Sequence, residues 1–361
     1  MHLLDATRLA ASQRLPKRPA ISLSWYAMPL GLAGLGGAWT AAPLGPTAAW
    51  FGDAFTALAG MIWLTFTVLY IWSGTRTRGT FRAERTHATR GPLSAYIPVV
   101  ALLLVIHYER ISGQLRSWSV VVLVAALALL AAMILAHWFM GDLDEDAVHA
   151  GYYLPVVAGP FIAAVAIHSC GATEAAWAAF GAGAFFLVVL GAVIIGRLMF
   201  GSALTGELLP STAILLAAPA TAAIAWTDLR ANRPDEIAWC LLGVVVVMLL
   251  VQLALIPHYR RLSFGMSWWA FSFPLASAAN VTARVLEPHT SAIGLRTGLG
   301  FLIIATIVIA CLGFATIWLA ARHVARRVTR PRAGHRASTG RWVSPHRRTT
   351  WPEPIHTPTL W

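Results

Sequence analysis

Long apolar runs alternate with short polar breaks along most of the chain. A helix needs about 20 predominantly apolar residues to cross the hydrocarbon core of a bilayer. Measured against that length, the sequence holds ten candidate membrane helices, at residues 21–41, 51–73, 92–108, 118–140, 151–169, 173–200, 208–227, 236–257, 265–284 and 296–321. The pattern predicts an all-α integral membrane protein with ten transmembrane helices.

The composition agrees with that class. Apolar residues make up 58% of the chain and charged residues only 12%, whereas soluble domains carry about 25% charged residues. The three cysteines, Cys170, Cys240 and Cys311, lie far apart, which argues against a disulfide framework and against a Cys-x-x-Cys metal site. The polar, basic start leads directly into a full-length apolar run, so we expect no cleavable signal peptide.

The distribution of basic residues gives an orientation. They gather in the N-terminal tail, in the loops after the second and eighth spans, and in the C-terminal tail: Arg8, Arg14, Lys17, Arg18, Arg76, Arg78, Arg82, Arg85, Arg90, Arg260, Arg261 and the arginines from 322 to 348. Basic loops stay in the cytoplasm, so both termini are predicted to be cytoplasmic, with the protein in the cell inner (plasma) membrane. The same asymmetry explains the net charge of +12 without nucleic acid. Residues 142–146 are acidic, but acidic residues count little in this rule.

Three regions follow from these patterns. Residues 1–20 form a cytoplasmic N-terminal tail, residues 21–325 the ten-helix channel or transporter domain, and residues 326–361 a second cytoplasmic tail. This last tail is rich in Arg and Pro and has no apolar period, so we expect it to be disordered. It is either solvated without a specific role or lies on anionic lipid headgroups.

Proline marks every odd-numbered span, at Pro29, Pro98, Pro155, Pro219 and Pro274. A proline inside a helix removes one backbone hydrogen bond and kinks the helix. All odd spans run in the same direction, so the pattern predicts five helical hairpins, with five kinked helices forming an inner ring around a central pore and five straighter helices outside. The alternative is that proline is simply more common in membrane helices than in soluble ones.

The odd spans carry almost no ionisable residues, which in membranes usually mark proton relays or ligands. There is no charge from Ser267 to Ala283 or from Leu208 to Trp226. His107, His137 and His168 lie near span ends without close spacing, where they are expected to meet headgroups or backbone. We therefore expect no metal, no haem or other cofactor and no catalytic residues, and passive permeation is favoured over proton-coupled pumping.

One stripe of the ninth span carries Phe273, Ser277, Asn280 and Arg284. The spacing i, i+4, i+7, i+11 places these side chains on one face of a helix. An aromatic ring followed by two small polar groups and an arginine suggests a hydrophobic gate that opens onto a wetted vestibule. Alternatively, Ser277 and Asn280 only bond to a neighbouring helix. Parallel inner helices also aim their positive N-terminal ends at the cytoplasmic mouth, which favours anions.

The octapeptide Ser267-Trp268-Trp269-Ala270-Phe271-Ser272-Phe273-Pro274 resembles the WWA-[FY]-[ST]-FP signature of the tellurite-resistance/dicarboxylate transporter family, which includes bacterial TehA and the plant guard-cell slow anion channels. Pro29 to Gly36, Tyr153 to Val157, Leu209 to Thr212 and Ala218 to Ala220 are also similar to the family. The resemblance covers about residues 20–325. It implies ten helices in five hairpins, homotrimers with one pore per subunit, and a pore blocked by the phenylalanine at Phe273.

Three functions remain open at this point. The first is a channel or uniporter in the lipid bilayer for small inorganic or organic anions, gated by Phe273. The second is a coupled exporter of C4-dicarboxylate, sulfite or tellurite on the same scaffold. The third is a membrane-embedded enzyme or sensor, which the lack of clustered ionisable, Cys or His residues at depth disfavours. No nucleic-acid partner is expected, and a pore without charged ligands does not identify its ion.

Overall fold

A computed structural model describes residues 21–76, 80–108, 113–141, 143, 145–204, 206–231, 233–286 and 292–328. The N-terminal tail predicted at 1–20 lies outside these residues, as does all of the C-terminal tail beyond Val328. The contacts divide the chain into two units, Met1–Trp318 and Leu319–Trp361.

Each of the ten apolar runs is helical, and within the described residues there is no strand. Five runs are continuous helices: α3 (Pro46–Thr75), α6 (Gly113–Phe139), α8 (Thr173–Phe200), α10 (Glu236–Tyr259) and α12 (Ala292–Val328). The other five begin with a tighter or wider turn: η1 (Leu23–Tyr26) before α2 (Ala27–Thr40), η2 (Gly91–Ala95) before α5 (Tyr96–His107), η4 (Ala150–Tyr152) and η5 (Leu154–Ala158) before α7 (Gly159–His168), η6 (Gly206–Ala213) before α9 (Ile214–Leu229), and η7 (Met266–Phe271) before α11 (Ser272–Leu286). Two short helices, α4 (Thr80–Arg85) and η3 (Glu145–Ala147), lie in connections. The all-α class is confirmed.

Burial separates the two sets of helices. In the segments Ala150–His168 and Leu208–Leu229, 83% and 78% of the most apolar stretch is buried, against 17% in α3, α6, α8 and α10. The continuous helices instead expose many large apolar side chains, such as Met61, Val122, Val188 and Leu250. Exposed apolar surface on this scale fits contact with lipid.

Seven of the described helices are long and apolar enough to cross a membrane, and the segment Gly91–His107 is apolar but shorter. A multi-pass membrane protein is therefore well supported by the structure. The ten crossings and the side on which the termini lie stay predictions.

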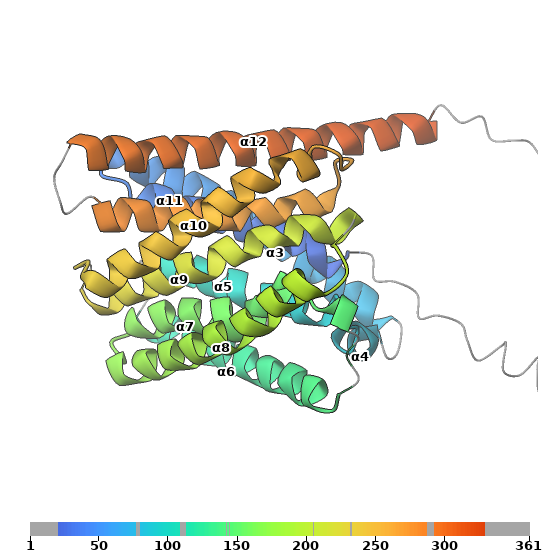
Figure 1. The fold of residues 1–361 in the computed structure, drawn as a ribbon, viewed down its shortest axis with the longest axis horizontal. Coiled ribbons are helices and arrows are strands. Elements are labelled where there is room, and N and C mark those ends of the chain that lie inside the picture. The colour runs from blue at the N-terminus through green and yellow to red at the C-terminus, as the bar shows by residue number, and fades with distance from the viewer. Residues whose placement is uncertain are drawn as a thin grey trace, which may run out of the picture. The chain divides into compact units, whose positions relative to one another are not determined.

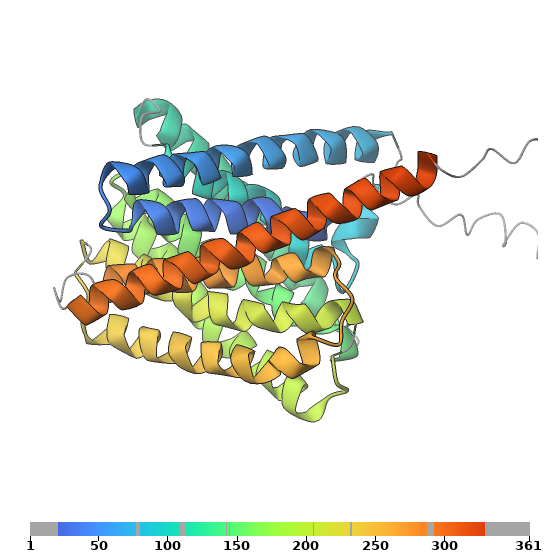
Figure 2. The ribbon, with the colours of Figure 1, turned by 90° about the horizontal axis from the view of Figure 1, so that it is seen from above.

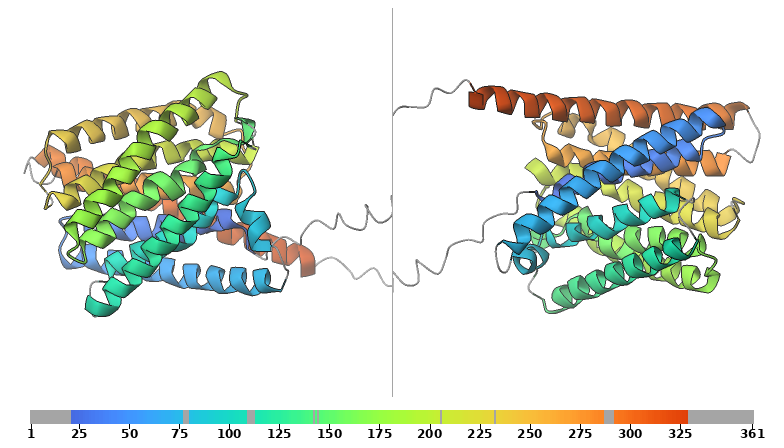
Figure 3. Two further views of the ribbon diagram at one scale, coloured as in Figure 1. Left: turned by 90° about the horizontal axis from the view of Figure 1, so that it is seen from below. Right: turned by 180° about the vertical axis from the view of Figure 1, so that it is seen from behind.

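The buried helices contact one another in a closed sequence. α2 contacts α5, α5 contacts α7, α7 contacts α9, α9 contacts α11, and α11 contacts α2 again. Four continuous helices, α3, α6, α8 and α10, each pack on the buried helix that precedes them in the chain. The helices run side by side along one direction (Figure 1). Seen from below, α6 and α8 lie in front of the buried helices, and from behind α3 does (Figure 3).

The last helix is attached differently. Up to Trp318, α12 runs obliquely across α2 and α11 (Figure 2). Its buried side chains Leu302, Ala305, Ile309 and Leu312 recur at helical spacing and face the same core as α2. Two indoles also reach it: Trp39 Nε1 donates to Thr306 Oγ1 at 3.0 Å, and Trp269 Nε1 donates to Thr316 Oγ1 at 2.9 Å.

Four of the five prolines lie where the helix type changes. Pro29, Pro98 and Pro274 are each the third residue of an α-helix that follows a 3₁₀ turn, and Pro155 lies in the π-helical turn η5. Only Pro219 lies farther inside its helix, α9. A proline in the first turn removes no intrahelical hydrogen bond, because the first N–H groups have no partner there. The predicted kink in mid-helix thus applies to Pro219 alone, and for the other four the structure places an irregular turn at the start of the α-helix.

Candidate functional site

Phe273 is the second residue of α11 and its side chain is buried, with 7% of the residue exposed. Its ring lies against the backbone of Gly34 in α2. A Cβ at Gly34 would stand 2.8 Å from Cδ2 and 3.1 Å from Cε2 of this ring. Only glycine leaves room for the ring at this distance. We call the surface of α2 at Gly34, on which the Phe273 ring packs, the Gly34 seat.

Gly31 also lets α11 approach α2, and Gly37 lies on the same face of α2 at ordinary contact distance. A Cβ at Gly31 would collide with the side chain of Ser272, and one at Gly37 would stand 3.4 Å from Nδ2 of Asn280. Ser272 Oγ lies 2.6 Å from the carbonyl of Trp269 and 3.2 Å from that of Ala27, so this hydroxyl donates at the junction of the two helices. Small residues permit such close packing in membranes. Gly31, Gly34 and Gly37 therefore form the face of α2 that meets α11.

The predicted polar stripe of α11 bonds mainly within its own helix. Ser277 Oγ donates to the carbonyl of Pro274 at 3.0 Å. Arg284 Nε donates to Asn280 Oδ1 at 2.8 Å. Asn280 is 8% exposed and Ser277 is 2% exposed, so neither is a freely solvated group. The structure brings Phe273 and Asn280 to the α2 face, while Ser277 satisfies its hydrogen bond locally.

A cavity of about 540 Å³ lies at the N-terminal ends of the buried helices. We call it the vestibule. Residues from all five helix starts line it, together with the connection before α5: Ser22, Ser24, Trp25, Ala27, Glu84, His87, Thr89, Arg90, Leu93, Tyr96, His149, Leu208, Ser211, Ile214, Met266, Ser267 and Ala270. Helix N-termini carry unpaired N–H groups and a partial positive charge. The vestibule is thus a chamber of mixed polar and apolar lining on which five such ends converge.

Phe273 follows the vestibule residue Ala270 by three positions along the chain. The sequence had placed a wetted vestibule on the other side of Phe273, toward Asn280 and Arg284. The chamber described here lies on the N-terminal side instead. Sequence reasoning missed it because its wall includes residues 84–90 and His149, which lie outside the predicted spans.

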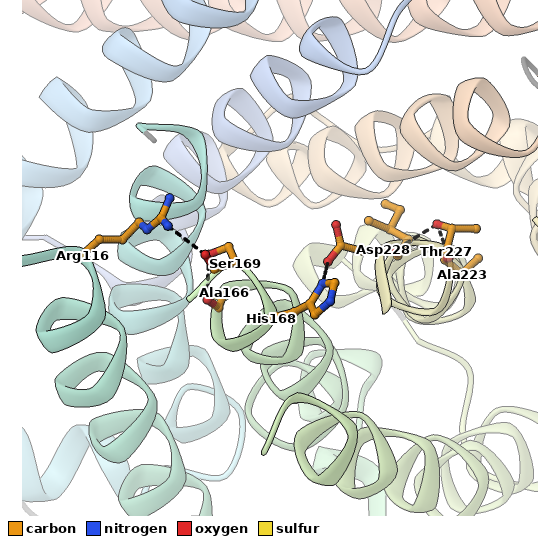
Figure 4. Close-up of polar contacts among 8 residues, drawn as sticks. Arg116, Ala166, His168, Ser169, Ala223, Thr227 and Asp228 are labelled. Atoms are coloured by element: carbon orange, nitrogen blue, oxygen red, sulfur yellow. Dashed lines mark hydrogen bonds and ion pairs between the residues drawn. The ribbon is translucent and has the colours of Figure 1, made fainter. Parts of the chain in front are cut away.

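The opposite ends of the buried helices carry histidine–aspartate pairs. His168 Nδ1 lies 2.9 Å from Asp228 Oδ2, joining the end of α7 to α9, while Arg116 of α6 donates to the carbonyl of Ser169 at 2.8 Å (Figure 4). His107 at the end of α5 lies 2.8 Å from Asp53 of α3. The sequence had assigned these histidines to headgroups or backbone. Each histidine lies at the end of its own helix and contacts a carboxylate of a neighbouring helix.

Within the described ranges, no three His, Cys, Asp or Glu side chains gather in a way that would hold a metal ion. The vestibule offers instead one guanidinium, one carboxylate, two imidazoles and several hydroxyls. Such groups can bind and orient a small polar solute, and two of them contact each other, since Thr89 Oγ1 lies 3.2 Å from His87 Nδ1.

The closed sequence of buried helices, the exposed apolar surface around it and the vestibule are typical of a membrane protein of the channel or transporter type. The chain belongs to the SLAC1 family, described as voltage-dependent anion channel, whose family model matches residues 20–324. This confirms the family predicted from the octapeptide at 267–274.

Individual relatives agree with that assignment. The chain is 26% identical over 260 residues to the "Tellurite resistance protein TehA homolog" of Haemophilus influenzae, covering 71% of this chain and 78% of that protein. It is also 27% identical to the "S-type anion channel SLAH2" of Arabidopsis thaliana over 46% of this chain and 32% of that protein, and 26% identical to the "Guard cell S-type anion channel SLAC1" of the same plant over 36% and 23%. The chain thus spans most of the bacterial relative and a third or less of the two plant channels.

Proposed function

We propose that this protein lets small inorganic or organic anions pass through a pore within each subunit, and that Phe273 closes the pore at rest. One observation carries the proposal: the buried ring of Phe273 sits on Gly34 one helical turn beyond the vestibule on which the five buried helices converge.

The contacts among the buried helices support such a path. Because α2, α5, α7, α9 and α11 contact one another in a closed sequence, they can enclose an axis. Irregular backbone at membrane depth is tolerated where it is buried in protein or lines a wet cavity. The 3₁₀ and π turns at the starts of these helices, with the prolines beside them, meet that condition. On this arrangement the protein crosses the inner (plasma) membrane ten times and has both termini in the cytoplasm.

The helix ends support an anion as the solute. Five N-termini face the vestibule, and each favours negative charge. From Phe273 to Ala283, α11 carries no charged side chain, so the constriction has no fixed charge to bind a passing ion tightly. An aromatic ring in such an apolar constriction closes the path by excluding water. Removing the ring should therefore open the path without altering the charge that selects anions.

Phe273→Ala tests the proposal. Current through the variant should exceed that of the parent by about tenfold or more, since a barrier lowered by 1.4 kcal/mol already gives a factor of ten. The measurement is anion current under voltage clamp at equal surface expression. Equal, low currents in both proteins would remove Phe273 from its assigned role.

Phe271→Ala is the matched control. The Phe271 ring packs edge-on against Tyr259 of α10 at 4.9 Å between centroids, and against Trp268 at 5.8 Å. It therefore points away from the Gly34 seat, and its removal should leave the current low.

A coupled exporter of C4-dicarboxylate, sulfite or tellurite is the second candidate, favoured by the likeness to a tellurite-resistance protein. The same voltage clamp separates the two. Channel current reverses at the equilibrium potential of the anion whatever the pH gradient, whereas coupled export shifts the reversal potential with the gradient. We further propose a homotrimer with one pore per subunit, following the family resemblance, which the mass of the detergent-solubilised complex tests.

A further inference from the structure

The connection from Glu84 to Gly91 forms one wall of the vestibule. It folds back on itself, since the N–H of His87 donates to the carbonyl of Glu84 at 3.2 Å and the N–H of Gly91 donates to that of His87 at 2.7 Å. It is also tied to the start of the α7 segment, where Tyr152 Oη donates to the carbonyl of Ala88 at 3.0 Å. The wall is therefore an ordered surface with defined side-chain positions.

His149 anchors this wall as a neutral side chain. Its Nδ1 accepts from the N–H of Gly151 at 3.1 Å, so the proton sits on Nε2, which donates to the carbonyl of Thr89 at 3.0 Å. Burial lowers the pKa of His149, an effect that the nearby Arg197 reinforces and the bond to Thr89 opposes. His149 is thus not the positive group of the vestibule.

The positive group is Arg90, and it is paired with a buried acid. Arg90 Nη1 lies 3.2 Å from Glu84 Oε1; the Glu84 side chain is 5% exposed and that of Arg90 is 30% exposed. The second carboxylate oxygen, Oε2, is enclosed and makes no hydrogen bond of good geometry within the described part of the chain, although the Tyr70 hydroxyl lies close to the carboxylate. Burial raises the pKa of the Glu84 carboxyl. The positive charge of Arg90 and the nearby Tyr70 hydroxyl act in the opposite direction and lower that pKa.

The geometry points to Arg90 as a binding residue for small oxyanions in the vestibule, with Glu84 as the internal carboxylate that competes for the same guanidinium. The inference rests on the proposed anion pathway and names its first binding site. Guanidinium groups pair with planar carboxylate-like anions through two parallel N–H···O bonds, which a spherical halide cannot match. Formate and similar oxyanions should therefore be preferred over chloride at this site.

The protonation state of Glu84 determines how strongly it competes with an anion for Arg90. When Glu84 is ionised it neutralises Arg90, and when it takes up a proton the guanidinium charge becomes available to an anion. The groups that face Glu84 are Arg90 and, from α3, Tyr70, while His87 and His149 line the same chamber. The enclosed, half-satisfied carboxylate is easier to protonate than an exposed one. Acidifying the solution on the vestibule side should therefore increase anion flux, and acidifying the other side should not.

The test uses the Phe273→Ala background in excised patches, with formate or chloride as the permeant anion and the pH of each face changed in turn from 7.5 to 5.5. Adding Glu84→Gln should raise the formate current at pH 7.5 about two- to fivefold, the effect of one charge acting across several ångströms of wet protein, and should abolish the response to acid. The gain should shrink at high salt, because the screening length is about 8 Å at 0.15 M ionic strength.

Arg90 variants complete the comparison. Arg90→Gln should lower the formate current and make the background insensitive to Glu84→Gln, whereas Arg90→Lys keeps the charge and should lose only the preference for formate over chloride. Glu236→Gln removes an exposed carboxylate at the far end of α10 and should change nothing. If Phe273→Ala conducts but neither Glu84→Gln nor Arg90→Gln alters current or pH response, the site is refuted while the pore stands.

A binding measurement keeps the inference testable if Phe273→Ala fails to conduct, the result that removes Phe273 from its assigned role. Formate should raise the melting temperature of the detergent-solubilised parent at pH 5.5, since a ligand that binds only the folded state stabilises it. The rise should be absent in Arg90→Gln and present at pH 7.5 in Glu84→Gln. The same rise in parent and Arg90→Gln would overturn the assignment of Arg90.

Discussion

Gly34→Ala places a methyl group where the Phe273 ring now lies. The new Cβ would stand 2.8 Å from Cδ2 of Phe273, 3.1 Å from Cε2 and 3.3 Å from the Cβ of Ala276, all short of the 3.4 Å at which ordinary van der Waals contact begins. The ring or α11 must move by about 0.6 Å to relieve the shortest contact. Such overpacking costs about 1–3 kcal/mol, and we expect Gly34→Ala to lower the free energy of unfolding by that amount.

The decisive measurement is a double-mutant cycle. In Phe273→Ala the ring is gone, so Gly34→Ala should cost almost nothing there. The coupling between the two positions should equal most of the single-variant cost, about 1–3 kcal/mol. Free energies of unfolding are obtained by titration with a denaturing detergent, and surface expression is checked in parallel. Gly243→Ala is the matched control, since a Cβ at that helical glycine of α10 would meet nothing within 4 Å.

Two results would refute this reasoning. If Gly34→Ala costs the same with and without the Phe273 ring, the ring does not rest on Gly34 in the membrane. If Gly243→Ala costs as much as Gly34→Ala, the loss reflects general intolerance to alanine and carries no information on the seat.

Further predictions concern the vestibule wall and the attachment of α12. Because the pKa of His149 is lowered in the folded state, the unfolded chain binds a proton at this residue at a higher pH than the folded protein does. The free energy of unfolding should therefore be unaffected by His149 above the ordinary histidine pKa of about 6.5 and should fall as the pH decreases below it. His149→Gln should flatten that dependence of melting temperature between pH 7 and 5.5, and an unchanged slope would exclude His149 as its source. Thr306→Val and Thr316→Val each remove the acceptor of an indole N–H, from Trp39 and Trp269, and each should cost about 0.6–1.7 kcal/mol in the detergent titration; no loss in either variant would mean that α12 is held by its apolar stripe alone.

Much of the fold could be predicted from hydropathy alone. Every apolar run that the sequence marks is helical, because a run of that length and composition has few other ways to satisfy its backbone. The five prolines of the odd-numbered runs also all fall in the buried set of helices, although the exposed helix α10 contains Pro257 near its end. The irregular turns before α2, α5, α7, α9 and α11 were not predicted, since their 3₁₀ geometry depends on tertiary packing that local sequence does not encode.

The site was predicted in part. The octapeptide drew attention to Phe273, but its seat on Gly34 depends on the register between helices far apart in the chain. Arg197 shows the same limit, since its guanidinium lies 3.4 Å from Asp146, a residue far from it in the chain, in the connection before α7. That contact gives Asp146 a structural role that charge counting could not supply.

The pairing of α2 with α11 has a consequence for how the protein is made. Ala27 and Ser272, which meet at this junction, are 245 residues apart. At about 5–20 residues per second, a ribosome needs on the order of 10–50 s to synthesise the chain between them. Throughout that interval the glycine face of α2 has no α11 to cover it, and any nascent chain that stops before α11 lacks the ring of Phe273 altogether. The contact between the Phe273 ring and Gly34 therefore forms late in synthesis, and a copy that stops before α11 leaves the glycine face of α2 uncovered in the membrane.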